Sequence, residues 1–176
     1  MKKYFLLLSS LTLLTGCAQL DAIKREVVPP SFTAKDFIGM WYCSSSYGDW
    51  NIITKEYYDI QPNGMMKNTG TVTAPLLSGG IDLKYEYSIN AYWQIDGWYL
   101  VQKQAGKGKV VRKHDPRALA AMNKDPKLKQ RELKLYNTFK NMASGNHSAR
   151  RQIESVNATE FTTLANTSAE ICSRVN

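Results

Sequence analysis

An alternating stretch in the middle of the chain decides the fold: Ile81-Asp82-Leu83-Lys84-Tyr85-Glu86-Tyr87-Ser88-Ile89, continuing to Ile95. Apolar and aromatic residues occupy every second position, and Asp, Lys, Glu and Ser stand between them. Such strict alternation is typical of a β-strand with one buried face and one solvated face. The stretch therefore predicts a strand over residues 81–95 whose odd-numbered side chains, from Ile81 to Ile89, point into the core.

Further strand signals surround this stretch on both sides. Asp96-Gly97 is a hairpin signal, because both residues tolerate the backbone angles of tight turns, and residues 98–102 are expected to return alongside. Pro62-Asn63-Gly64 predicts another turn, and residues 75–80 are expected to form a loop. The other strands are predicted over residues 41–47, 52–60, 65–73, 109–113, 150–156, 160–165 and 169–175.

These strands favour a mainly β fold. Because open sheet edges invite aggregation, a run of meandering antiparallel strands favours closure into a β-barrel or half-barrel. A β-sandwich is the alternative, since it buries the same alternating faces between two sheets. The chain has 176 residues, of which 43% are hydrophobic and 22% charged, enough for about one such domain. We expect this domain over residues 36–176.

A pair of helices is expected to interrupt the strands. Asp115-Pro116 and Asp125-Pro126 each combine an N-cap residue with a proline at the first helical position. They predict helices over residues 116–123 and 126–142, an insertion at about 115–143. The apolar residues of the second helix recur at helical spacing and form one face: Leu128, Leu135, Phe139 and Met142.

The first seventeen residues resemble the export signal of bacterial lipoproteins. Met1-Lys2-Lys3 precedes a short apolar run, and Leu14-Thr15-Gly16-Cys17 resembles the lipobox of that family. The resemblance implies a signal peptide over 1–16, acylation of Cys17 and a tether over 17–35. Because Ala18, not Asp, follows Cys17, it also implies the periplasmic face of the outer membrane.

Cys43 and Cys172 remain once Cys17 is set aside. An even number of cysteines in the oxidising periplasm predicts a disulfide. It would close a loop of about 130 residues, for which chain entropy gives at most about 5 kcal/mol. Two buried thiols or a metal pair are the alternatives, although His114 and His147 both lie in polar, loop-like segments and a zinc site would lack ligands.

Positive charge is concentrated in one segment. Residues 102–151 hold fourteen Lys and Arg against three Asp and Glu, a net charge of +11 in a chain of formal charge +8. Such a segment near a membrane anchor is typical of a solvated helix face or of a surface that binds anions. Lys127, Arg131 and Lys134 are the residues that we expect to meet an anionic lipid or an acidic envelope protein.

The residues Phe32-Thr33-Ala34-Lys35-Asp36-Phe37-Ile38-Gly39-Met40-Trp41-Tyr42 resemble the opening of a lipocalin. That family begins with a short helical turn and a Gly-x-Trp at the start of the first strand, where the Trp plugs the closed end of the barrel. The resemblance assigns these roles to Gly39 and Trp41. It also implies that an Arg of the last strand covers the Trp, and Arg174 is the candidate. The family's second motif, Thr-Asp-Tyr, is absent.

These features lead to a membrane-anchored binding module as the expected function. Aromatic residues are typical of a barrel core, but also of a pocket for an apolar or amphipathic ligand, and the expected ligand-binding residues are Trp41, Tyr87, Trp93 and Trp98. The alternative is a structural or accessory lipoprotein of an envelope assembly, with a filled barrel and no small-molecule ligand.

No enzyme is expected. His114 beside Asp115 could form a catalytic dyad, but a helix N-cap explains Asp115 better. Gly106-Lys107-Gly108-Lys109 lacks the spacing of a phosphate-binding loop. We therefore expect no catalytic residue, no metal and no organic cofactor, and the periplasmic location makes a nucleic-acid partner improbable.

Overall fold

The computed structural model describes residues 29–47, 51–77, 80–165 and 168–176. The expected signal peptide, Cys17 and the greater part of the expected tether lie outside these residues. The chain divides into two units, Met1–Ser31 and Phe32–Asn176. Everything that follows concerns the second unit.

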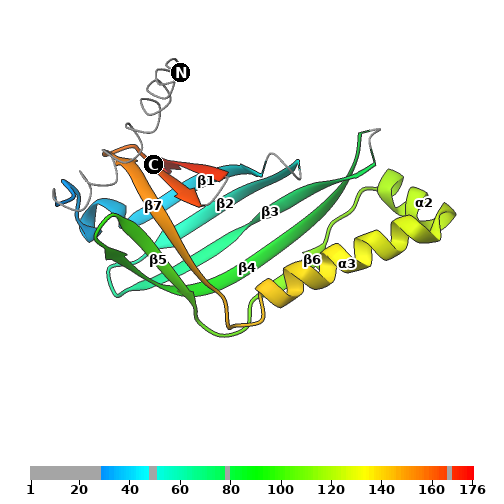
Figure 1. Ribbon diagram of the computed structural model, residues 1–176, viewed down its shortest axis with the longest axis horizontal. Helices are drawn as coiled ribbons and strands as arrows, with labels where there is room; N and C mark the ends of the chain where they lie inside the picture. The colour runs from blue at the N-terminus through cyan, green and yellow to red at the C-terminus, as the bar shows by residue number, and fades with distance from the viewer. Residues whose placement is uncertain (1–28, 48–50, 78–79, 166–167) are drawn as a thin grey trace, which may run out of the picture. The chain divides into compact units, whose positions relative to one another are not determined.

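The described strands of this unit form one antiparallel sheet that closes on itself (Figure 1). The strands are β1 (Gly39–Tyr47), β2 (Ile52–Ile60), β3 (Met65–Leu77), β4 (Ile81–Asp96), β5 (Tyr99–Gln104), β6 (Lys109–Arg112), β7 (Ser148–Val156), β8 (Glu160–Ala165) and β9 (Ser168–Arg174). Their order is β3-β2-β1-β9-β8-β7-β5-β4-β6, and β3 also pairs with β4. Eight strands therefore form a closed barrel, and the alternative of a β-sandwich is excluded.

The barrel is of the up-and-down type, because strands that are neighbours in the ring also follow one another along the chain. The exceptions are the pairing of β1 with β9, which closes the ring, and β6, which lies outside it. β6 stands apart from the ring and pairs with the first half of β4, while β5 pairs with the second half. The alternation that predicted β4 is confirmed: Leu83, Tyr85, Ala91 and Trp93 are buried, and the even-numbered residues are exposed apart from the half-buried Ser88. Eight strands in this order are the architecture of the lipocalin barrel.

The helices lie where their caps predict them. A 3₁₀ turn, η1, spans Ala34–Phe37, and the α-helices are α2 (Pro116–Lys124) and α3 (Pro126–Met142). The carboxylate of Asp115 accepts a hydrogen bond from the Ala118 backbone N at 2.8 Å, and that of Asp125 accepts one from the Lys127 backbone N at 2.8 Å. In the described part of the chain, no helix is both long and apolar enough to cross a membrane.

One predicted boundary is wrong. The loop expected from Pro75 is instead the end of β3, which continues to Leu77. The pairing of β3 with β4 shifts in register between Pro75 and Leu77. Such an irregularity accommodates a proline, which cannot donate a hydrogen bond to the ladder.

Trp41 plugs one end of the barrel, as the lipocalin resemblance implies. Its side chain is fully buried, and its indole N–H donates to the Phe37 carbonyl at 2.8 Å. The Arg174 guanidinium lies over the ring, 4.0 Å from its centroid. Arg174 also donates to the carbonyls of Asp36, Ile38 and Ala158. This end is thus closed by a side-chain stack that bridges both termini of the domain.

Gly39 is required by that stack. Its φ is +131°, a backbone conformation that side chains with a Cβ rarely adopt. A Cβ at this position would also come within 2.7 Å of Arg174 Nη1. The glycine of the Gly-x-Trp motif therefore makes room for the arginine that covers the tryptophan.

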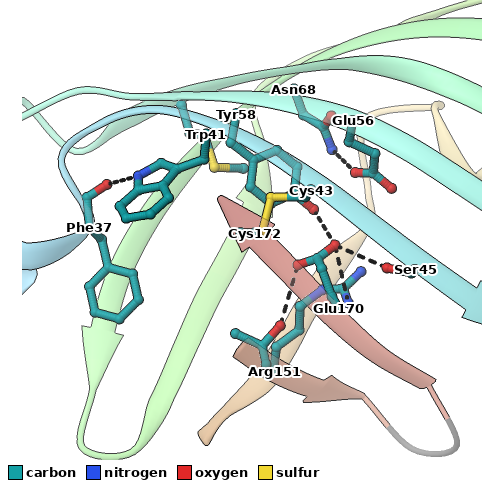
Figure 2. The surroundings of a disulfide bond; sticks show 12 residues. Phe37, Trp41, Cys43, Ser45, Glu56, Tyr58, Asn68, Arg151, Glu170 and Cys172 are labelled. Carbon is teal, nitrogen blue, oxygen red and sulfur yellow. Dashed lines mark hydrogen bonds and ion pairs between the residues drawn. A yellow bond between two sulfur atoms is a disulfide. The ribbon is translucent and has the colours of Figure 1, made fainter. Parts of the chain in front are cut away.

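A disulfide joins the first strand to the last (Figure 2). Cys43 and Cys172 are directly opposite in the β1–β9 ladder, and Trp41 and Arg174 are opposite two residues further along. The predicted pairing is confirmed, with a sequence separation of 129 residues. Because both sulfurs are buried, the bond belongs to the core of the barrel.

The apolar core has two parts. One cluster fills the end that Trp41 closes and includes Phe37, Leu100 and Phe161. The other lies between β3, β4 and the helices, where Leu128, Leu135 and Phe139 of α3 pack against buried barrel residues. The predicted apolar face of α3 thus packs on the barrel, except that Met142, 47% exposed, lies outside the cluster.

Replacing Gly39 by alanine should destabilise the domain by about 3 kcal/mol, because it adds backbone strain and displaces Arg174. Gly97→Ala is the control: its φ is also positive, but a Cβ there meets no atom within 4 Å, so it should cost about 1–2 kcal/mol. Urea unfolding measures both. In an Arg174→Ala background the cost of Gly39→Ala should fall, and simple additivity of the two losses would contradict this account.

Candidate ligand cavity in the barrel

A cavity of about 510 Å³ lies inside the barrel. That volume falls in the range of small-molecule sites in proteins, about 300–1,000 Å³. Apolar side chains from β2, β3, β4 and β6 form much of its wall, among them Ile52, Val72, Tyr85, Ile89 and Val110. The barrel is therefore filled at the Trp41 end and hollow beyond it.

Helix α3 completes the wall of this cavity. Leu135, Thr138, Phe139 and Met142 line it, together with Ala143 just after the helix. Figure 1 shows α3 running beside β6, and the helix contacts β3 as well. Since four of its side chains line the cavity, any displacement of α3 changes the access of a ligand.

Glu132 fixes α3 to the barrel. Its side chain, 7% exposed, accepts hydrogen bonds from Arg112 Nε at 2.8 Å and from the Tyr85 hydroxyl at 3.2 Å. His114 Nδ1 accepts from the Lys84 backbone N at 3.1 Å, so Nε2 carries the proton and donates to Glu132 at 3.2 Å. Burial opposes ionisation, but the bonds from Arg112 and His114 outweigh it and hold the pKa of Glu132 below its ordinary value.

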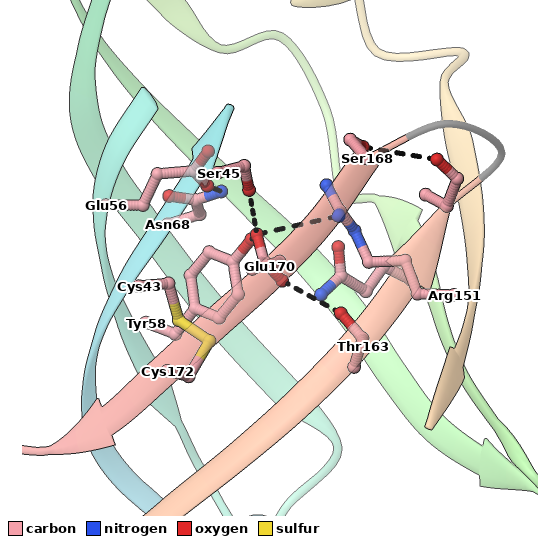
Figure 3. A network of polar contacts seen from close by, with 12 residues as sticks. Cys43, Ser45, Glu56, Tyr58, Asn68, Arg151, Thr163, Ser168, Glu170 and Cys172 are labelled. Atoms are coloured by element: carbon pink, nitrogen blue, oxygen red, sulfur yellow. Dashed lines mark hydrogen bonds and ion pairs between the residues drawn. A yellow bond between two sulfur atoms is a disulfide. The ribbon is translucent and has the colours of Figure 1, made fainter. Parts of the chain in front are cut away.

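A network of buried polar side chains lies inside the barrel, and we call it the polar belt (Figure 3). Its members are Ser45, Tyr58, Arg151, Thr163 and Glu170. Its centre is Glu170, a fully buried carboxylate on β9. Glu170 accepts hydrogen bonds from the Tyr58 hydroxyl at 2.8 Å, from Ser45 at 3.4 Å and from Thr163 at 3.3 Å. Ser45 and Thr163 are its direct partners on the strands to either side, so the ladder itself assembles the belt. The pKa of Glu170 is raised above its ordinary value, and the largest cause is its burial.

Arg151 enters the belt from β7. Its Nη1 lies 3.6 Å from Glu170 Oε1, an ion pair but too long for a hydrogen bond. Within the described residues, its Nε and Nη1 make no hydrogen bond although both atoms are buried. Burial works against its charge, but the neighbouring Tyr58 and Glu170 raise the pKa of the guanidinium above its ordinary value.

Glu56 and Asn68 form a second polar pair on the cavity wall. Asn68 Nδ2 donates to Glu56 Oε2 at 2.8 Å, whereas Asn68 Oδ1 is buried without a hydrogen-bond partner in the described part of the chain. Burial and the nearby Glu56 raise the pKa of Tyr87, which also lines the cavity. A Cβ on Gly70 would come within 2.5 Å of the Lys55 carbonyl oxygen and 3.1 Å of Glu56 Cγ, so the glycine lets β3 pass close to this part of β2.

The four aromatic residues expected at a ligand site do not gather there. Tyr87 lines the cavity, but Trp41, Trp93 and Trp98 belong to or pack against the cluster at the filled end. Trp93 also donates from its indole N–H to the Gln61 carbonyl at 2.9 Å. Alternation predicts which side chains face inward but not how far along the barrel axis they lie. It therefore could not distinguish residues of the filled end from residues that line the cavity.

Glu170 and Arg151 were not identified from the sequence as polar residues inside the barrel. A usable signal existed for Glu170, which stands two positions before Cys172 on one strand and must share its inward face. No sequence pattern predicts that Arg151 points inward. It lies in the basic segment 102–151, which we expected to be on the surface. Two residues of the basic segment 102–151 thus have partners of their own: Arg151 enters the barrel, and Arg112 packs over the Tyr136 ring at 3.5 Å.

The expected anion-binding residues lie outside the cavity. Lys127, Arg131 and Lys134 are all exposed on α3. Arg131 and Lys134 border a smaller depression of about 280 Å³ beside Ile52 and Pro75. The structure thus separates the basic row of α3 from the interior site.

Replacing Glu132 by glutamine should destabilise the domain by about 2 kcal/mol at pH 7, the scale of hydrogen bonds to a charged group. Because its pKa is lowered in the folded protein, the contribution of Glu132 is complete above its ordinary pKa and is lost as pH falls through the folded value. Unfolding measured from pH 7 to pH 3 should show the two proteins converging at acid pH.

The control for this substitution is Glu86→Gln, which removes an exposed ion pair with Lys113. It should cost under about 1 kcal/mol. Equal losses for the two variants, or a difference that persists unchanged to pH 3, would contradict the role given to Glu132.

Two parts of the chain are similar to known proteins. Residues 1–18 match the family profile of the prokaryotic membrane lipoprotein lipid attachment site, whereas no curated protein matches the chain. Among solved structures, it is similar to a lipocalin-like protein from Bacteroides uniformis, with 15% identity and a TM-score of 0.43, covering 80% of this chain and 99% of the other. A likeness of this size carries no inference; the barrel rests on this chain's own strand order. The chain therefore combines a match to the prokaryotic lipoprotein lipid attachment site at residues 1–18 with a closed, lipocalin-like barrel of eight antiparallel strands.

Proposed function

We propose that the protein binds one small amphipathic ligand inside the barrel and acts as a binding module, not as an enzyme. The observation that carries this proposal is the cavity of about 510 Å³, which has apolar walls and buried polar atoms that lack a hydrogen-bond partner among the described residues. Protein interiors are normally packed without voids of this size. An empty space of these dimensions argues for an occupant.

The lining divides the cavity into two chemical regions. Ile52, Val72 and Phe139 offer apolar contacts, and their burial by a ligand would contribute about 25 cal/mol per Å² of apolar surface. Arg151 and Asn68 offer polar groups. An amphipathic molecule satisfies both regions, whereas a purely apolar one leaves the polar atoms unpaired.

The hollow interior also distinguishes this function from its alternative. A structural or accessory lipoprotein of an envelope assembly needs no cavity, and its barrel could be filled throughout.

The location is part of the proposal. We infer that acylated Cys17 anchors the chain at the periplasmic face of the outer membrane, because Ala18 follows the lipobox cysteine. A tether over residues 17–35 would then place the domain, residues 36–176, close to a lipid surface. A ligand that exchanges with that surface would be amphipathic, in agreement with the cavity.

Filling the cavity should abolish binding. Ala149→Phe adds a ring at the cavity wall and should weaken the binding of a fluorescent acyl-chain analogue at least tenfold. Ala169→Phe is the matched control, because Ala169 is exposed on β9 and should leave affinity unchanged. Mass spectrometry of lipid extracted from the purified protein should find a co-purifying amphiphile. A protein that carries no lipid and binds no acyl-chain compound would overturn the proposed function.

An anionic surface is a second candidate partner, favoured by the basic row on α3. Lys127, Arg131 and Lys134 are spaced four and three residues apart, so they share one helix face. We infer that α3 meets anionic lipid head groups, where each cation contributes on the order of 1 kcal/mol.

Reversing these three residues to glutamate should remove co-sedimentation with vesicles that contain phosphatidylglycerol, and should leave ligand binding intact. The control reverses Lys35, Lys55 and Lys67, three exposed cations away from α3, and changes the net charge equally. If both triple variants lose vesicle binding to the same degree, net charge alone attracts the protein. If neither loses it, the basic row is only a solvated face.

A further inference from the structure

We infer that the polar end of the bound ligand is uncharged and carries both a hydrogen-bond acceptor and a donor, as a hydroxyl or glyceryl head group does. The acceptor meets Arg151 and the donor meets Asn68. This inference rests on the proposed function and adds to it the chemical class and the orientation of the ligand.

The unpartnered atoms define what the ligand must supply. Arg151 Nε and Nη1 are donors, and both are buried without a hydrogen bond in the described residues. They need an acceptor. Because buried polar groups in proteins are almost always paired, an unpaired donor on a cavity wall indicates a ligand or an ordered water.

Asn68 sets the opposite requirement. Its Nδ2 donates to Glu56 Oε2 at 2.8 Å, which fixes the orientation of the amide and leaves Oδ1 as the free atom. Oδ1 is a buried acceptor without a partner in the described part of the chain, so it needs a donor. An ionised carboxylate or phosphate has acceptors only and would leave Oδ1 unpaired.

Charge excludes an anionic head for an independent reason. Two carboxylates, Glu56 and Glu170, are buried in the polar region, and Arg151 is the cation that faces them there. Arg151 already pairs with Glu170 at 3.6 Å. A third negative group would lack a cation of its own in a poorly solvated interior, where like charges repel strongly.

A cationic head fails for the converse reason. It would be attracted by the two carboxylates, but it would have to lie beside the guanidinium of Arg151 and would offer Nε and Nη1 no acceptor. A neutral head with both functions thus pairs with the unpartnered atoms of Arg151 and Asn68 and adds no charge to the interior.

Three ligands that share one acyl chain length test the inference: 1-decanoylglycerol, decanoate and decyltrimethylammonium, titrated calorimetrically into the soluble domain at pH 7.5. The glyceride should bind at least tenfold more tightly than either charged ligand. If decanoate or the ammonium ligand binds as tightly or more tightly, the inference is wrong although the proposed function stands. If none of the three binds, both are wrong.

Substitutions test which residues set the preference for the neutral head group over the charged ones. Glu170→Gln removes a negative charge and keeps the shape of the side chain, so it should narrow the preference for 1-decanoylglycerol over decanoate by about tenfold. Asn68→Leu should weaken the glyceride several-fold and leave decanoate unchanged. Glu86→Gln, on the outer face of β4, is the matched control and should alter neither affinity.

The variants must also be shown to fold, by circular dichroism and thermal unfolding. If Glu170→Gln does not fold, Glu56→Gln tests the same charge from β2, and Asn68→Leu tests the donor requirement alone. An unchanged preference in every folded variant would overturn the assignment of the polar end to this region.

Discussion

The pairing of the first strand with the last is the constraint on which the rest of the structure depends. Along β1 and β9, Trp41 faces Arg174, Cys43 faces Cys172 and Ser45 faces Glu170. The first pair closes one end of the barrel, the second forms the disulfide, and the third belongs to the polar belt. Without this ladder the sheet would have two open edges, and no interior would exist to be filled or left hollow.

The closed barrel has two parts along its length: an apolar cluster at the Trp41 end and the cavity beyond the polar belt. The proposed function depends on the second part. The plug excludes water at one end, so a ligand has apolar and polar walls only beyond the belt. Glu132 holds α3 against the barrel through a charged hydrogen-bond network, whereas Leu135 and Phe139 provide the apolar packing. The helix thus forms part of the cavity wall and carries the basic outer row, so both proposed roles, ligand binding and attraction to anionic lipid, involve the same element.

Much of the fold could be predicted from the sequence, because its signals are local. Alternation identified β4, and the Asp-Pro pairs fixed the starts of both helices. The depth of inward side chains could not be predicted, since it depends on how strands are staggered around the ring, and three tryptophans expected at a ligand site lie at or beside the plug. Buried charge was also invisible, because Arg151 and Glu132 resemble surface residues until the barrel and α3 surround them.

The direct test of the account is the side-chain NMR spectrum of arginine in the domain, recorded without and with 1-decanoylglycerol. Arg151 Nε–H is buried at the cavity and has no hydrogen-bond partner among the described residues, whereas Arg174 Nε–H donates to the Ala158 carbonyl at the filled end. The account predicts a large shift of the Arg151 signal on saturation, with the Arg174 signal unmoved. A saturated complex in which the Arg151 signal does not move would contradict it.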